Sequence, residues 1–150
     1  MISSRPARRV VADVVGELSG FESIIDAGSG WGTLAFYLAG RFPGKRITGL
    51  ENSTVPFWTS KFLKRIFAPP KLQFLQKDIY TYDYSKEDII VCYLYPGAMH
   101  RFKELATSFK EGTVLISVCF AIAGWHPLKT IICKDMFRTK VYVYQYLKSG

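Results

Sequence analysis

The sequence has few of the residues that build metal centres and disulfide frameworks. Its 150 residues include three cysteines and two histidines. No Cys-x-x-Cys pair or Cys/His cluster occurs, so we expect no metal site. Cys92, Cys119 and Cys133 each lie in an apolar run, which is typical of buried free thiols in a reducing compartment.

Long hydrophobic runs, low-complexity tracts and internal repeats are also missing. The longest apolar run covers residues 114–125, whereas a membrane-spanning helix needs about 20 residues. The basic N-terminus is not followed by the apolar core of a signal peptide. We therefore expect one cytoplasmic domain over residues 1–150, with no transmembrane segment.

Acidic residues are the minority charge. There are 12 Asp and Glu residues against 20 Lys and Arg residues, and the net charge is +8. Such a balance favours contact with nucleic acid, with an acidic protein face or with an anionic membrane surface. Composition leaves these partners open, and it leaves the oligomeric state undetermined.

Apolar patterning predicts strands that alternate with helices. We expect an α/β fold with a mostly parallel sheet, helices on both faces and a closing antiparallel hairpin. The order is four strand–helix units, a strand and the hairpin. Strands are predicted over residues 23–27, 46–51, 72–76, 88–93, 113–120, 128–133 and 140–147. Helices are predicted within residues 1–20, over 32–41 and 54–67, and between Pro96 and Gly112.

The helix predicted over residues 54–67 carries apolar residues at helical spacing and a basic cluster. We expect its apolar side chains to face the core and its basic side chains to lie opposite them. The apolar set is Val55, Trp58, Phe62, Leu63 and Ile66, and the basic set is Lys61, Lys64 and Arg65.

Residues 26–32, with the sequence DAGSGWG, form the strongest chemical signal. A buried strand ends at Asp26, and glycines alternate at positions 28, 30 and 32. Glycine has no Cβ, so such a turn lets a ligand approach the backbone. The dinucleotide pattern G-x-G-x-x-G would need glycine at position 33, which is Thr33. The pattern and Asp26 therefore favour a ligand bearing a cation or hydroxyl groups over a pyrophosphate.

Glu51 ends the second predicted strand, about 20 residues after the glycine turn. An acid at that place is typical of a residue that grips both hydroxyls of a ribose. Together with the glycine turn, Glu51 predicts a nucleoside-containing cofactor.

The glycine turn, Glu51 and the later pair Asp78–Ile79 resemble the successive cofactor motifs of class I S-adenosylmethionine methyltransferases. The resemblance covers about residues 23–147 and implies a Rossmann-like fold and S-adenosyl-L-methionine as cofactor. It places the glycine turn under methionine and ribose, Glu51 on the ribose, and Asp78 on the adenine amino group. The cofactor-binding residues it implies are Asp26, Gly28, Ser29, Gly30, Gly32, Glu51, Asn52, Asp78, Ile79 and Tyr93.

Three later segments carry a closer resemblance. Residues 91–96, 112–117 and 124–127 are similar to small bacterial relatives of the mitochondrial protein-lysine methyltransferases. Those mitochondrial enzymes modify the adenine nucleotide translocase and the ATP synthase c-ring. This sequence lacks their apolar N-terminal membrane segment, so the identity of the substrate does not carry over.

The segment after the fourth strand is where transfer should occur. It reads Tyr93-Leu94-Tyr95-Pro96, without the Asn/Asp-Pro-Pro-Tyr motif of many enzymes that methylate bases. Tyr93, Tyr95 and Trp125 are candidate walls of an acceptor pocket, with Tyr95 as the candidate catalytic residue. An N-terminal lid within residues 1–20, with Arg5, Arg8 and Arg9, would border the same opening.

The leading prediction is a methyltransferase that acts on a protein lysine. The alternatives are a methyltransferase acting on RNA or a small molecule, and a cofactor-binding interaction module that has lost catalysis.

Overall fold

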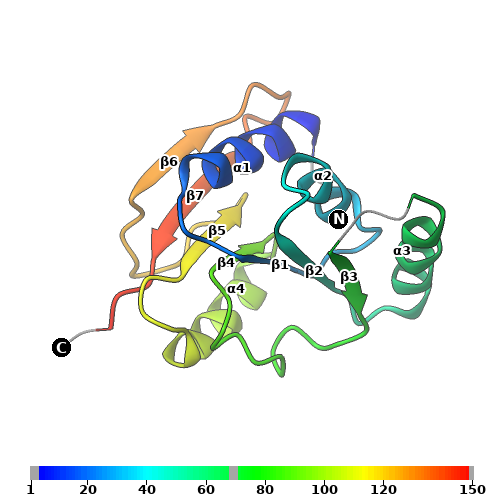
Figure 1. Ribbon diagram of the computed structural model, residues 1–150. Helices are drawn as coiled ribbons and strands as arrows, with labels where there is room; N and C mark the ends of the chain where they lie inside the picture. The colour runs from blue at the N-terminus through cyan, green and yellow to red at the C-terminus, as the bar shows by residue number, and fades with distance from the viewer. Residues whose placement is uncertain (1–3, 68–70, 149–150) are drawn as a thin grey trace.

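The computed structural model describes residues 4–67 and 71–148. Seven strands form one sheet in the order β3-β2-β1-β4-β5-β7-β6 (Figure 1). The strands are β1 Ser23–Ala27, β2 Arg46–Leu50, β3 Leu72–Leu75, β4 Ile89–Cys92, β5 Val114–Val118, β6 Lys129–Ile132 and β7 Lys140–Gln145.

Strands β1 to β5 are parallel, and β7 pairs antiparallel with both β5 and β6. The predicted α/β sheet with its C-terminal hairpin is confirmed. The chain adds strands outward from β1 to β3, then returns to place β4 on the other side of β1. The carboxyl ends of β1 and β4 therefore flank the point where strand order reverses, which is where open α/β sheets bind ligands.

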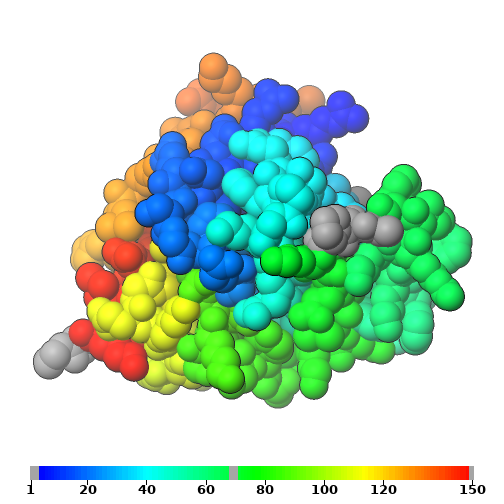
Figure 2. Space-filling model, viewed as in Figure 1, coloured from blue at the N-terminus to red at the C-terminus, as the bar shows by residue number. Residues whose placement is uncertain are grey.

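Helices cover both faces of the sheet. They are α1 Arg5–Glu17, α2 Thr33–Arg41, α3 Thr54–Phe67 and α4 Pro96–Lys103, and α4 continues into the 3-10 helix η1, Glu104–Ser108. In the view of Figure 2, α1 and α2 cover the near face. Alternate residues of β1 separate the two cores. Ile24 packs in the cluster with Val11 and Leu38, and Ile25 packs in the cluster with Tyr84 and Phe102.

The connection from β3 to β4 differs from the prediction of four strand–helix units. Residues 76–88 form turns and no helix, so only three strands are followed by helices before β5. Tyr84 holds this connection in place. Its buried side chain lies in the core, and its hydroxyl donates to the carbonyl of Ile79 at 2.6 Å. One buried tyrosine thus anchors a segment that has no helical pattern of its own.

The buried face of α3 also differs from the prediction. The sheet side of the helix is occupied by Phe57 and Ser60, which are both buried. The expected apolar stripe instead faces outward, except for the half-buried Leu63. Its exposed members are Val55, Trp58, Phe62 and Ile66. Helical spacing identified the stripe correctly but does not say which of two apolar faces meets the sheet.

The start of α1 is fixed on the β6–β7 turn. Ser4 caps the helix, since its Oγ accepts from the backbone N–H of Ala7 at 3.2 Å. The same hydroxyl donates to the Asp135 carboxylate at 2.9 Å. Figure 1 shows the two segments side by side. Of the predicted lid, residues 1–3 lie outside the described residues.

Among the helices of residues 4–67 and 71–148, none combines the length and the hydropathy that a membrane crossing requires.

Candidate functional site

The turn after β1 folds back over the end of β2. Gly28, Gly30 and Gly32 have φ angles of 77°, 57° and 84°, in the left-handed region that favours glycine. The N–H of Ser29 donates to the carbonyl of Leu50 at 2.7 Å, and the N–H of Gly32 donates to the carbonyl of Ser29 at 2.9 Å. These bonds fix the turn at the carboxyl edge of the sheet.

Two of these glycines serve different purposes. A Cβ on Gly32 would lie 2.9 Å from both the Phe74 ring and the Ser60 hydroxyl, so glycine is needed there for packing. A Cβ on Gly28 would meet only Leu94 within 4 Å, at 3.8 Å. Gly28 therefore adjoins open space at the end of β1, where a ligand can approach the backbone.

Asp26 is a buried carboxyl group at the end of β1. Burial and, to a smaller extent, the charge of Glu51 raise its pKa to about 7. Glu51 follows β2 and continues the sheet, because its N–H donates to the carbonyl of Leu75 at 3.1 Å. Two acidic side chains from adjacent strands therefore act on one another at the predicted cofactor edge.

Ser29 provides an independent sign of a ligand. Its side chain is buried, yet among the described residues its Oγ has no hydrogen-bond partner. Buried polar atoms are nearly always paired, so the orphaned Ser29 hydroxyl is a group that a ligand bound at this edge can satisfy. Ser29, Asp26 and Glu51 together fit a ligand that carries both a cation and hydroxyl groups.

The ends of β2 and β3 are linked on the same edge. Gln76 donates through Nε2 to the carbonyl of Asn52 at 3.4 Å. Asp78 follows two residues later and is half-buried, and its Oδ1 accepts from the N–H of Tyr80 at 2.9 Å. Ile79 is also half-buried. The predicted adenine-binding segment is thus at the expected edge, with one Asp78 oxygen engaged by its own turn.

Two tyrosines follow β4. A side-chain hydrogen bond with Cys119 and partial burial raise the pKa of Tyr93 to about 12, so its phenol is protonated at neutral pH. Tyr95 directly precedes α4, and 67% of its surface is exposed. The chain therefore presents one hydrogen-bonded phenol and one exposed aromatic ring at this edge.

The structure contradicts the prediction for Trp125. Its ring packs on Tyr144 and Tyr146, with centroid distances of 5.8 Å and 6.5 Å. Tyr146 pairs through its N–H with Thr113, just before β5, so Trp125 lies toward the amino-terminal edge of the sheet. It cannot line an acceptor pocket with Tyr93 and Tyr95. From the sequence, the Gly124–Trp125 turn was expected beside the site. Its true position depends on tertiary contacts that the sequence pattern does not reveal.

Three residues that support the edge were missed in the sequence. Ser60 donates to the carbonyl of Gly30 at 3.4 Å, and Phe74 packs against Gly32 and Gly49. Cys119 follows β5 with φ of 79°, and its side-chain hydrogen bond with Tyr93 raises the pKa of that phenol. The position of Cys119 after a parallel strand was an available signal, whereas Ser60 and Phe74 depend on tertiary contacts.

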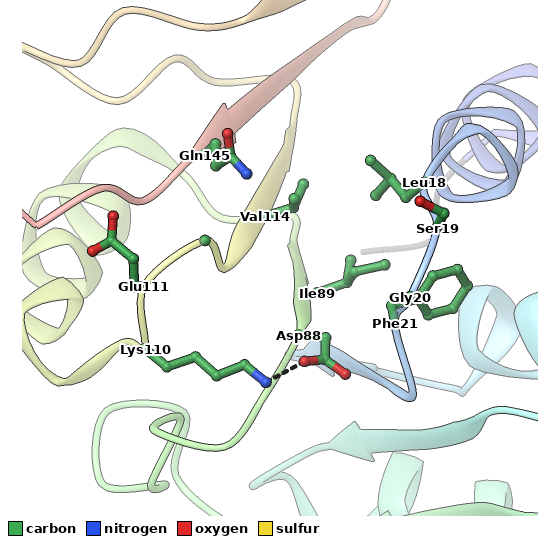
Figure 3. Close-up of a pocket in the computed structure, with 11 residues that line it drawn as sticks. Leu18, Ser19, Gly20, Phe21, Asp88, Ile89, Lys110, Glu111, Val114 and Gln145 are labelled. Atoms are coloured by element: carbon green, nitrogen blue, oxygen red, sulfur yellow. Dashed lines mark hydrogen bonds and ion pairs between the residues drawn. The ribbon is translucent and has the colours of Figure 1, made fainter.

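The pocket drawn in Figure 3 is at the opposite edge. It lies at the starts of β4 and β5 and includes the ion pair between Lys110 and Asp88. Asp88 also accepts from the N–H groups of Glu22 and Ser23 at 2.7 Å and 3.2 Å. These bonds fix the start of β1 and account for Asp88 as a structural residue. The pocket is therefore not the candidate cofactor site.

Solved structures with the same fold are methyltransferases. An RNA methyltransferase from Salinibacter ruber in complex with S-adenosyl-L-homocysteine is 20% identical, with a TM-score of 0.84 over 100% of this chain and 96% of that one. TrmN from Thermus thermophilus is 13% identical, with a TM-score of 0.76 over 95% and 49%. Precorrin-6y C5,15-methyltransferase from Geobacter metallireducens GS-15 is 12% identical, with a TM-score of 0.72 over 98% and 90%.

These likenesses establish the methyltransferase fold. A search of the curated proteins gave no significant match. A family model for the ANTKMT methyltransferase domain matches residues 26–129, which is well over half of the chain. The match includes the glycine turn, the tyrosines after β4 and the three acids Asp26, Glu51 and Asp78. The chain therefore belongs to the ANTKMT methyltransferase domain family.

Proposed function

We propose that this protein is an S-adenosyl-L-methionine-dependent methyltransferase that methylates a lysine amino group of a protein. The observation that most directly supports this cofactor is the buried Asp26 beside Glu51, next to the open backbone of Gly28. Two carboxyl groups of adjacent strands need cationic or hydroxyl partners, and the cofactor offers both. The orphaned hydroxyl of Ser29 supports the same ligand.

Different residues at this edge would bind different parts of the cofactor. Asp26 would accept from the ammonium group of the methionine part, Glu51 would accept from the ribose hydroxyls, and Asp78 would accept from the adenine amino group. When bound, the cofactor supplies an activated methyl group on a sulfonium. Gly28 and Gly30 would let the backbone lie close to the cofactor, and Gly32 would shape the turn. Asn52, Ile79 and Tyr93 would border the cofactor.

The acceptor side requires a neutral amine, because the nitrogen lone pair must form the bond to the methyl carbon as the carbon–sulfur bond breaks, with the thioether S-adenosylhomocysteine as the leaving group. A free lysine has a pKa near 10.4, and an apolar, aromatic surrounding lowers it by disfavouring the cation. Tyr95 offers an exposed aromatic face, which a bound acceptor would cover. Tyr93 is a poor base for this proton, since its raised pKa keeps the phenol protonated at neutral pH. We therefore infer that alignment and desolvation contribute most.

RNA is the second candidate acceptor. The net charge of +8 suits a polyanion, and the Salinibacter ruber protein of the same fold is an RNA methyltransferase. Against RNA, the segment after β4 has Tyr93-Leu94-Tyr95-Pro96 in place of Asn/Asp-Pro-Pro-Tyr. Lysine remains the proposal because the matching family model, that of the ANTKMT domain, agrees with the resemblance of the sequence to protein-lysine methyltransferases.

A transfer assay distinguishes these acceptors. Purified protein and cofactor with a tritiated methyl group are added to a lysate, and the products are treated with protease or nuclease. Methyllysine in the acid hydrolysate, absent with Glu51→Ala but present with the exposed control Glu104→Ala, is the expected result. Label that only nuclease releases would replace lysine with RNA. Cofactor binding without any labelled product would indicate an interaction module.

A further inference from the structure

Helix α3 exposes an unusual amount of apolar surface. Val55, Trp58, Phe62 and Ile66 are 66%, 56%, 63% and 58% exposed. Their spacing of three and four residues places them on one side of the helix, opposite the buried Phe57 and Ser60. Figure 1 shows α3 at the periphery of the molecule, beyond the edge strand β3. We call these four side chains the α3 stripe.

Basic residues flank the α3 stripe. Lys61 and Arg65 are exposed and fall on the same side of it, one helical turn apart. The Lys61 ammonium lies 5.4 Å from the centre of the Trp58 ring and 5.6 Å from that of Phe57. Trp58 thus has an apolar body beside a cation, which is the pairing found where a helix meets the boundary between lipid headgroups and acyl chains.

We propose that α3 docks this protein on an anionic lipid surface. The α3 stripe would enter the acyl boundary, while Lys61 and Arg65 would contact the negatively charged headgroups. Net charge adds to the attraction, since the chain carries +8 overall. The proposal concerns where the protein is held, and it stands apart from the identity of the methyl acceptor.

Other occupants fit the α3 stripe less well. A second copy would bring another +8 charge against Lys61 and Arg65, and a single helix about 21 Å long offers little area for a stable dimer. RNA would satisfy the basic residues but leave four apolar side chains in water. Lipid satisfies both features together.

Docking through α3 would also bring the cofactor edge close to the lipid surface. Thr54 begins the helix three residues after Glu51, so the amino-terminal end of α3 adjoins the candidate site. A methyl acceptor presented at a membrane would then lie near the edge where Glu51 and Asp26 are placed.

Vesicle sedimentation with the full chain tests the proposal. The probes are vesicles of phosphatidylcholine alone and vesicles of phosphatidylcholine mixed with phosphatidylglycerol, at low and high salt. We expect binding to the anionic vesicles, weakened by salt because surface charges are screened. We expect at least tenfold weaker partitioning for the double variant Trp58→Ser/Phe62→Ser and for Lys61→Glu/Arg65→Glu.

Two control variants match these changes. Leu128→Ser alters an apolar residue of similar exposure, 66%, just before the edge strand β6, and Lys86→Glu reverses an exposed charge elsewhere. Both controls should sediment like the original protein. All variants should keep the original melting temperature and affinity for S-adenosylhomocysteine, which shows that the fold survives.

Several results would overturn the proposal. These are absence of binding to anionic vesicles, equal binding by the Trp58→Ser/Phe62→Ser variant, and equal loss in the Leu128→Ser control. A dimer in light scattering that this double variant abolishes would assign the α3 stripe to a second copy. Loss of RNA binding in that variant, with no vesicle binding, would assign it to nucleic acid.

Discussion

Asp26 is the next-to-last residue of β1, and Glu51 directly follows the adjacent parallel strand β2; the charge of Glu51 adds to burial in raising the pKa of Asp26 to about 7. The surroundings of Asp26 in the folded protein thus bring the pKa of its carboxyl group close to neutral pH. A cationic ligand that pairs with the ionised form removes this penalty. The unfavourable free energy of burying an ionised Asp26 is therefore offset when such a ligand binds.

The first prediction concerns stability and pH in the absence of cofactor. The pKa of Asp26 is 3.8 when unfolded and about 7 when folded, so the folded protein binds more protons between these values. Its contribution to the free energy of unfolding is fully present below pH 4 and is lost as pH rises through 7. The difference amounts to about 4 kcal/mol at most.

Denaturant unfolding of the original chain and of Asp26→Asn, at several pH values, checks this. The lowered pKa values of Asp83, Asp88 and Asp135 give slopes of the opposite sign, so the comparison of the two proteins isolates Asp26. The stability of the original chain relative to Asp26→Asn should fall from pH 4 to pH 7. A constant difference would show that Asp26 ionises normally.

The second prediction concerns Glu51. The Glu51→Ala change would remove the two charge-assisted hydrogen bonds to a ribose that we propose for this residue, each worth about 1.5–3 kcal/mol. Affinity for S-adenosylhomocysteine should fall at least tenfold, which corresponds to about 1.4 kcal/mol. The change should also lower the pKa of Asp26, because a neighbouring negative charge is removed.

Titration calorimetry measures both effects. The affinity is read directly, and the proton released on binding near pH 6 is obtained from buffers with different ionisation enthalpies. Glu104→Ala, an exposed carboxylate on η1, should change neither. Unchanged affinity in Glu51→Ala would make Glu51 an ordinary surface acid.

Sequence reasoning placed the candidate cofactor residues on one edge of the sheet because that edge is built from local signals. A strand followed by alternating glycines, and acids after the next strands, place Asp26, Glu51 and Asp78 on one edge once the strands are parallel. The sheet itself followed from apolar runs and their spacing. Helix α3 was bounded correctly for the same reason, since its apolar residues keep helical spacing within residues 54–67.

The errors arose where tertiary contacts decide. Two faces of α3 carry aromatic residues, and only packing selects Phe57 over Trp58 for the sheet. Trp125 follows β5, but the chain then turns back and packs the partly buried ring against Tyr144. The turns between β3 and β4 depend on Tyr84, whose role is visible only from its buried hydroxyl contact.

The third prediction compares alanine substitutions at two glycines of the turn, Gly28 and Gly32, with one at Gly20, which lies before β1. Gly20, Gly28 and Gly32 have similar φ angles of 75°, 77° and 84°, so alanine adds a comparable backbone strain of about 1–2 kcal/mol at each. Gly20→Ala should cost only that, because nothing lies within 4 Å of its Cβ. Gly32→Ala should cost more, because its Cβ would lie 2.9 Å from Phe74 and Ser60.

Gly28→Ala should resemble Gly20→Ala in stability but differ in cofactor binding. Its Cβ enters open space that we assign to the cofactor, so the affinity for S-adenosylhomocysteine should fall several-fold. Chemical denaturation and calorimetry on the three variants provide the measurements. If Gly28→Ala binds as tightly as Gly20→Ala, the cofactor does not approach the backbone there.

The last prediction concerns the acceptor side. Tyr95 is two-thirds exposed at the carboxyl end of β4, whereas Trp125 packs on Tyr144 and Tyr146 toward the other edge. Tyr95→Ala should abolish methyl transfer while cofactor affinity changes less than tenfold, or about 1.4 kcal/mol. Tyr95→Phe keeps the aromatic face and should retain most of the activity if the ring, and not the hydroxyl, positions the acceptor.

Trp125→Ala is the informative contrast, because sequence patterning alone grouped it with Tyr95. The change removes a partly buried ring that packs against a core cluster, so the melting temperature should fall while kcat per folded molecule is kept. Steady-state kinetics on the identified acceptor, at a temperature where each variant is folded, separate the two residues. Full activity in Tyr95→Ala would place the transfer site elsewhere on the edge. A specific loss of kcat in Trp125→Ala, without loss of stability, would instead show that the amino-terminal edge takes part in the reaction.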